Sequence, residues 1–151
     1  MSKAIASNKS ARRDYEIFET LEAGIELRGS EVKSVRAGNV NLKDSFARIE
    51  KGEVFLYNTH ISPYAQASYL NADPLRVRRL LLHKSQIRKL YSDLSQRGFT
   101  LVPLSIYFNE RGNVKIELAL CKGKRFYDRR EDLKRREADL AIRRFMKNKR
   151  K

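Results

Sequence analysis

Cysteine and histidine are scarce in this chain of 151 residues, which has one cysteine and two histidines. The lone Cys121 excludes an internal disulfide, and it leaves too few thiols for a Cys-rich metal site. Neither His60 nor His83 has a cysteine, a carboxylate or a second histidine at metal-ligand spacing. The chain therefore fits a reducing compartment, and we expect it to use no metal and no other cofactor.

Long apolar runs and catalytic motifs are also missing. No uninterrupted apolar stretch approaches the roughly twenty residues that a membrane span requires. The opening residues, MSKAIASNKSARR, lack the apolar stretch of a secretory signal. No GxxxxGK phosphate loop occurs, and acidic neighbours such as Asp14 and Glu16 are better explained as solvated charges than as an acid–base pair. We therefore expect a soluble, cytoplasmic protein that is not an enzyme.

Positive charge, in contrast, is abundant and unevenly distributed. The formal net charge is +15, of which residues 1–13 carry +4. Residues 122–151 carry +9, with fourteen Lys or Arg against five Asp or Glu. A near-neutral body with basic ends favours a polyanionic partner, nucleic acid above all. We expect a flexible basic segment at 1–13, an RNA-binding domain at 14–124 and a basic tail at 125–151.

Alternating apolar and polar residues predict that the domain is mainly β. Strands are expected at 14–28, 46–50 and 54–59, and a hairpin is expected at 99–121 with its turn at Asn109–Gly112. Two short helices are expected as well, one capped by Ser30 and ending at Gly38, the other capped by Ser85 and ending at Gly98. About five or six strands with interposed helices favour a small antiparallel β-barrel. By analogy, a basic protein suits the oligonucleotide-binding type of barrel.

Three parts of this domain are less regular. Gly24 is expected to mark a bulge or a bend in the first strand. Residues 61–74 form an irregular connection of a length that is often functional. Residues 75–83 fit either a strand or a buried approach to the second helix.

Basic side chains alternate with aromatic and apolar residues at 12–18, 76–83 and 122–130. An exposed ring can stack on a base while neighbouring cations hold phosphates. The rings expected to serve the core instead are Tyr15, Phe18, Phe55 and Tyr107. Tyr127 lies between two basic pairs without apolar periodicity around it, so a stacking role is favoured there.

The basic tail combines helix-forming features with an interrupted apolar face. Asp128 and Glu131 have the D-x-x-E spacing of a capping box, and acid-before-base pairs four residues apart follow them. Such a helix has little apolar surface to bury against its own body. We therefore predict a tail that becomes helical when it binds a partner.

Six segments, taken in order, resemble a known family. They read NKSARRDYEI, EAGIELRGSEVKSVRAGNVNLKDSFARI, GEVFLYNTHISPY, ADPLRVRRLLLHKSQI, LVPLSIYF and KGKRFYDRRE. On these segments the chain resembles the SsrA-binding protein family, also called small protein B, the partner of transfer-messenger RNA (tmRNA) in bacterial trans-translation. The resemblance extends from Asn8 to about Lys149. It implies an oligonucleotide-binding-type barrel with flanking helices that binds the tRNA-like domain of tmRNA.

The resemblance also implies which residues bind RNA. The family ties the glutamate of the E-A-G segment and the end of the L-L-L-H segment to RNA binding, and these are Glu22, Leu81 and His83 here. A carboxylate can accept a hydrogen bond from a guanine amino group or a 2′-hydroxyl. The other RNA-binding positions expected on the matching segments are Asn8, Lys33, Arg36, Arg79, Lys122, Lys124 and Arg125.

The tail resembles the part that family members place in the vacant decoding centre and message channel of a stalled small subunit. The matching residues are Tyr127, Asp128, Arg129 and Arg130 at the decoding centre, and Phe145, Met146 and Lys147 deeper in the channel. An intact message excludes a basic helix from this channel, and a truncated message admits it. The implied partners are tmRNA, the small ribosomal subunit and, through the RNA, elongation factor Tu and alanyl-tRNA synthetase, with no membrane.

Two other classes of protein are alternatives. A ribosomal or assembly protein would bind ribosomal RNA through a small barrel, without preference for the tRNA-like domain of tmRNA. A cationic amphipathic protein would bind membrane surfaces, but the tail lacks the continuous apolar face that such a helix requires.

Overall fold

The computed structural model describes residues 4–64, 72–124 and 140–144. Its strands are β1 (Ala4–Ser7), β2 (Tyr15–Ile25), β3 (Val40–Asn41), β4 (Phe46–Glu50), β5 (Glu53–Tyr57), β6 (His60–Ile61), β7 (Arg78–Leu81), β8 (Phe99–Phe108) and β9 (Val114–Gly123). Its helices are α1 (Lys9–Asp14), α2 (Gly29–Arg36) and α3 (Lys84–Leu94).

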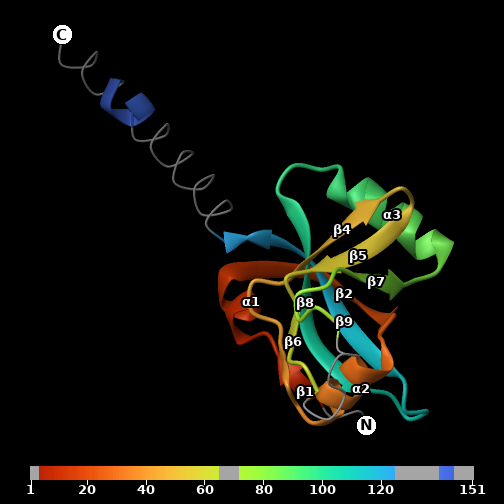
Figure 1. Cartoon of the computed structure of the whole chain (residues 1–151). Helices are drawn as coiled ribbons and strands as arrows, with labels where there is room; N and C mark the ends of the chain where they lie inside the picture. The colour runs from red at the N-terminus through yellow and green to blue at the C-terminus, as the bar shows by residue number, and fades with distance from the viewer. Residues whose placement is uncertain (1–3, 65–71, 125–139, 145–151) are drawn as a thin grey trace.

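The main sheet closes on itself (Figure 1). Its strands run in the order β1-β8-β4-β5-β7-β2-β9, every described pairing is antiparallel, and β8 also pairs with β9. The short strands β3 and β6 form a separate pair. The prediction of a mainly β antiparallel barrel with short helices is confirmed, and the β8–β9 pairing shows that the barrel is closed.

Two hairpins set the register of the barrel, both where the sequence predicts them. Lys51 and Gly52 join β4 to β5 with φ angles of 52° and 78°, the left-handed pair that a type I′ turn requires. The β8–β9 turn has Gly112 at φ 80°. In that turn the Asn109 side chain accepts hydrogen bonds from the N–H groups of Arg111 and Asn113.

The long strands β8 and β9 are buried on both faces. Leu118 and Leu120 of β9 belong to the main core, with exposed fractions of 0% and 4%. The alternate residues Ala119 and Cys121 point to the other face, where they join a smaller apolar cluster with Ala11 of α1. The double coverage explains why these two strands lack the usual polar outer face.

The helices α2 and α3 start earlier than their predicted caps. The N-cap of α3 is His83, not Ser85, and its N–H donates to Gln86 Oε1 at 3.0 Å. The N-cap of α2 is Arg28, not Ser30, and its N–H donates to a Glu31 oxygen at 2.8 Å. In both helices a long polar side chain, three residues after the N-cap, accepts the hydrogen bond of the N-cap N–H group. This explains why the helices begin before the predicted serine caps. Figure 1 shows α3 at the upper end of the barrel and α2 at the lower end.

In its described part, the N-terminal segment is not the flexible extension that its charge suggests. β1 pairs with β8, and the Asn8 side chain is 5% exposed. The Asn8 amide donates to the carbonyls of Leu42 and Pro103, at 3.2 and 3.0 Å. Its oxygen accepts from the Ser10 hydroxyl and the Ala11 N–H. A fully bonded amide thus fastens the start of the chain to the barrel.

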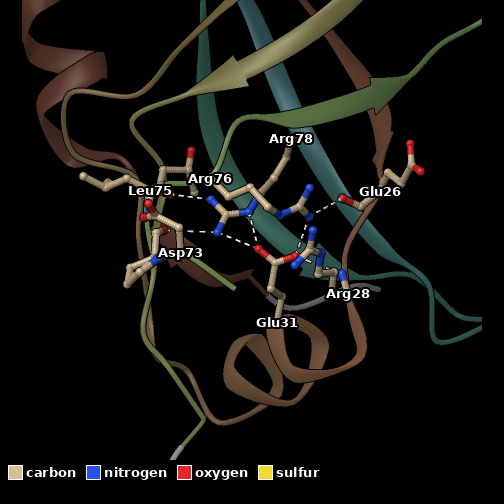
Figure 2. Close-up of polar contacts among 9 residues, drawn as sticks. Glu26, Arg28, Glu31, Asp73, Leu75, Arg76 and Arg78 are labelled. Atoms are coloured by element: carbon tan, nitrogen blue, oxygen red, sulfur yellow. Dashed lines mark hydrogen bonds and ion pairs between the residues drawn. The ribbon is translucent and has the colours of Figure 1, made fainter. Parts of the chain in front are cut away.

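A buried carboxylate joins α2 to the segment that leads into β7 (Figure 2). The Glu31 side chain is 4% exposed, and its oxygens accept from Arg76 Nη2 at 2.5 Å and from Arg78 Nε at 2.6 Å. Burial by itself raises the pKa of Glu31. Hydrogen bonds from Arg76, from the Arg28 N–H and from Arg78 outweigh burial and hold this pKa below its ordinary value.

The Arg78 guanidinium is fully buried and has further partners. It donates to the carbonyl of Thr59 at 2.6 Å and to that of Pro74 at 3.1 Å. Thr59 lies just before the irregular connection expected at 61–74, and Pro74 is the last residue of that connection. One arginine therefore fixes both ends of that connection as well as α2.

Replacing Glu31 with alanine should lower the free energy of unfolding by about 3–5 kcal/mol, because it leaves the buried Arg78 charge without its partner. Urea unfolding of the full chain measures this difference. Because the folded-state pKa of Glu31 is lowered, its contribution to stability is complete above the ordinary pKa that a glutamate has in the unfolded chain. The difference between wild type and Glu31→Ala should shrink as the pH falls through the folded-state pKa.

The matched control is Glu53→Ala, which removes an exposed carboxylate 3.0 Å from Arg79. An exposed ion pair contributes little, so this variant should unfold nearly as wild type does. Equal losses of unfolding free energy in the two variants would show that burial does not explain the contribution of Glu31 to stability.

Candidate nucleic-acid interface

The three residues most closely tied to RNA binding by the resemblance surround one surface depression. Glu22 of β2, Leu81 of β7 and His83 at the start of α3 line a hollow of about 360 Å³. The remaining lining residues are Gly24, Leu82, Gln86 and Lys115. They come from strands and a helix that are distant in the sequence, so only the closed barrel brings them together.

The Glu22 carboxylate is exposed and held in place. The Tyr107 hydroxyl, from β8, donates a hydrogen bond to it. Burial raises the pKa of Tyr107, and the hydrogen bond to Glu22 and the charges of Glu22 and Glu117 raise it further. Tyr107 is therefore a protonated donor at neutral pH, and Glu22 presents an oriented acceptor at the edge of the depression.

The opposite side of the depression is partly apolar. β7 alternates between buried and exposed residues, so Arg78 and Leu80 face inward while Arg79 and Leu81 face outward. Leu81 is 47% exposed. An acceptor, an exposed leucine and the Lys115 cation in one hollow can contact the sugar, base edge and phosphate of a nucleotide.

Gly24 sits where β2 passes between two partner strands. It pairs with Lys115 of β9 and with Leu81 of β7. The bulge expected at this glycine lies instead between Ile17 and Glu19. A Cβ at position 24 would meet the Leu81 Cβ at 3.1 Å, so the close approach of two strands explains the glycine.

The expected cations of α2 lie outside this depression. The Lys33 ammonium is 5.6 Å from the centre of the Tyr64 ring, and the Arg36 guanidinium is 5.5 Å from that of Phe108. Both side chains are exposed. They form a second cationic area, in which each charge lies over an aromatic face.

Arg79 and Asn8 are both engaged within the protein. Arg79 faces outward on β7 beside Leu81, but Glu26 and Glu53 hold its guanidinium, each at 3.0 Å. A phosphate would compete with these two carboxylates. The hydrogen-bonding groups of the Asn8 side chain are all engaged within the protein, and its oxygen caps the start of α1.

The expected residues near the end of the body lie at the end of β9. Lys122 Nζ is 4.4 Å from the centre of the Phe99 ring, and Lys124 is exposed. The expected site residues outside the described part of the chain are Arg125, Tyr127, Asp128, Arg129, Arg130, Phe145, Met146 and Lys147. The capping box at Asp128 also lies there. The short described stretch at 140–144 is helical.

Sequence reasoning missed several residues on the outside of the barrel. Tyr107, expected in the core, contributes its hydroxyl to Glu22, and Phe18, also expected there, is 50% exposed. The expectation for Phe18 is wrong because the bulge in β2 shifts the register at this residue. Lys115 could have been found, since it alternates with the apolar residues of its strand. Tyr15 packs against the smaller apolar cluster, as expected.

Among the described residues, no group of three or more His, Cys, Asp or Glu side chains is placed to hold a metal ion. In the same part of the chain, no helix is long and apolar enough to cross a membrane.

A closed antiparallel barrel that carries cations, exposed rings and a polar depression on its outer face defines a class, the small β-barrel proteins that bind nucleic acids. A sequence model described as SmpB protein matches residues 5–148. The chain therefore belongs to the SmpB protein family.

Relatives and a solved structure agree with this assignment. The SsrA-binding protein of Caldicellulosiruptor saccharolyticus is 59% identical over 145 residues, which cover 96% of this chain and 91% of the relative. That of Enterococcus faecalis is 56% identical over 149 residues, which cover 99% and 96%. A solved chain described as "tmRNA-SmpB: a journey to the center of the bacterial ribosome" is 57% identical, with a TM-score of 0.67 over 79% of this chain and 83% of that chain.

Replacing Gly24 with alanine should destabilise the protein by about 1–3 kcal/mol, because the new methyl group displaces Leu81 in a packed strand pair. Thermal or urea unfolding measures the loss. Gly29→Ala is the matched control, since a Cβ there meets nothing within 4 Å. If both variants unfold alike, the 3.1 Å approach does not explain the glycine at position 24.

Proposed function

We propose that this protein binds the tRNA-like domain of tmRNA and delivers it to stalled ribosomes for trans-translation. Membership of the SmpB family over nearly the whole chain carries this proposal. Relatives are named SsrA-binding protein, and the description of the similar solved chain names tmRNA and the bacterial ribosome. The depression lined by Glu22, Leu81 and His83 supports it, since residues tied to RNA binding in the family meet there.

The barrel of the protein makes the contacts with the tRNA-like domain. Glu22, oriented by Tyr107, accepts from an amino group or a 2′-hydroxyl, which distinguishes RNA from DNA. Leu81 gives an apolar contact beside it, and Lys115 offers a cation to a phosphate. The cations of α2 add a second set of phosphate contacts.

The tail supplies the ribosome contact. In this proposal it enters the vacant decoding centre and message channel, where its net positive charge matches a phosphate-lined wall. A message that fills the channel excludes it, so the tail selects ribosomes whose message ends early. Elongation factor Tu and alanyl-tRNA synthetase act through the RNA, and a protein with these partners works in the cytoplasm.

Replacing Glu22 with alanine should weaken binding to the tRNA-like domain of tmRNA by about 5- to 100-fold, the range expected for a lost base-edge contact. Replacing His83 with alanine should also weaken it. Gel-shift titration of the full chain, with ordinary tRNA as competitor, measures both effects.

Glu50→Ala is the control for the Glu22 variant. Glu50 is also an exposed carboxylate that accepts from a tyrosine hydroxyl, that of Tyr57, but it lies away from the depression. Its replacement should leave RNA affinity unchanged. Equal affinities for wild type and Glu22→Ala would remove the depression from the proposed interface.

A protein that ends at Lys124 should keep its affinity for the tRNA-like domain at physiological salt and lose tagging of products on stalled ribosomes. The strands of the barrel and the residues that line the depression all lie within residues 4–64 and 72–124. A reconstituted reaction on a message without a stop codon measures tagging. Tagging at the wild-type rate by the shortened protein would contradict the role of the tail.

A further inference from the structure

A second surface lies beside the C-terminal half of α3, away from the Glu22 depression at its N-terminal end. Phe18 is 50% exposed there, and its ring meets the Phe99 ring edge-on, with centroids 5.2 Å apart and an interplanar angle of 71°. Lys122 Nζ lies 4.4 Å from the centre of the Phe99 ring and 5.8 Å from that of Phe18. Two rings and one cation therefore form a compact group.

The core does not require Phe18 in this position. The β2 bulge places Phe18 between Ile17, which packs against the apolar cluster beneath α1, and Glu19, which pairs with Lys89 at 2.7 Å. Bulges commonly re-aim a side chain at functional sites. A large ring that is half exposed at a bulge therefore indicates a functional surface, whereas single exposed leucines are common on proteins.

Phe99 also lines a depression of about 320 Å³. Its other lining residues are Ala47, Arg48, Ile49, Tyr91, Leu94, Ser95 and Thr100. Tyr91 is 66% exposed. The volume is at the lower end of the range for small-ligand sites, which suits a single planar ring.

The charges around these rings favour a nucleotide over an apolar peptide. Lys122 and Arg48 are two of the cations of this surface. The carboxylate of Glu19 already has an ammonium partner, that of Lys89. A second acidic residue, Glu16, is paired with Lys122 in the register of β2 and β9. Cations beside exposed aromatic faces are the arrangement with which proteins bind single-stranded nucleic acid.

We propose that Phe18, Phe99 and Tyr91, with Lys122 and Arg48, form a stacking site for unpaired nucleotides of RNA. One base stacks on Phe18 while Lys122 holds its phosphate, and the depression between Phe99 and Tyr91 receives the next base. The identity of the natural RNA rests on the proposed function. The stacking chemistry does not.

The test uses the full chain and a single-stranded uridine RNA of about ten nucleotides, long enough to span one small-barrel site. Phe18→Leu should weaken binding about 5- to 100-fold, the range for one stacked base, and Phe18→Tyr should retain it. Because stacking releases no counterions, Phe18→Leu should leave the salt dependence unchanged. Lys122→Gln should reduce the slope of log K against log salt by about 0.7.

Photocrosslinking with 5-iodouridine in the same RNA locates the contact. Adducts on Phe18, Phe99 or Tyr91 are expected, and adducts confined to residues 125–151 would overturn the proposal. Tyr57→Leu is the control, since it removes a ring that stacks on Phe46 elsewhere on the barrel. It should bind the RNA as wild type does.

Two further outcomes would overturn the proposal. Equal binding by wild type and a folded Phe18→Leu variant would show that the ring does not stack on RNA. Reduced association of that variant with ribosomes, at unchanged affinity for the uridine RNA, would show that the surface contacts something other than unpaired nucleotides. Since no tmRNA is used, a failure of the proposed function leaves the uridine measurement intact.

Discussion

The buried ion pair between Glu31 and Arg78 is the constraint on which the arrangement of the proposed RNA surface depends. It couples α2 to β7, and the same guanidinium holds carbonyls at both ends of the irregular connection before β7. Because β7 alternates strictly between inside and outside, a fixed Arg78 also fixes the outward direction of Leu81. His83, two residues later, begins α3. An interaction in the interior thus determines the shape of a surface hollow.

Two of the proposed RNA surfaces, the Glu22 depression and the Phe99 depression, follow from the position of α3 against the barrel. Its first residues border the Glu22 depression, and its last turns border the Phe99 depression. β2 contributes to both ends, through Glu22 and through the bulge at Phe18. A strand of eleven residues that crosses from one partner strand to another can therefore present a polar group and an aromatic group to the same polyanion.

The sequence predicted the barrel well because its turns are local signals. Lys51–Gly52 and Asn109–Gly112 carry enough turn chemistry to place both hairpins. The first residues of the helices were harder to predict. The side chains of Glu31 and Gln86, inside the helices, bond the N-cap N–H groups. Asn8, Phe18 and Tyr107 could not be placed, because their surroundings come from residues far along the chain. Charge predicted that the tail binds nucleic acid, but it gave no indication of the ordered strand and helix near the N-terminus.

The pairing of β2 with β9 has a consequence for how the protein is made. Tyr15 lies opposite Gly123, and Asn8 binds a carbonyl 95 residues further along the chain. Contacts of such separation form late and slow the folding of small domains. On the ribosome, the ring stays open until the last strand has left the exit tunnel. The Glu22 depression, which needs Lys115 of β9, is thus assembled only after that strand has emerged.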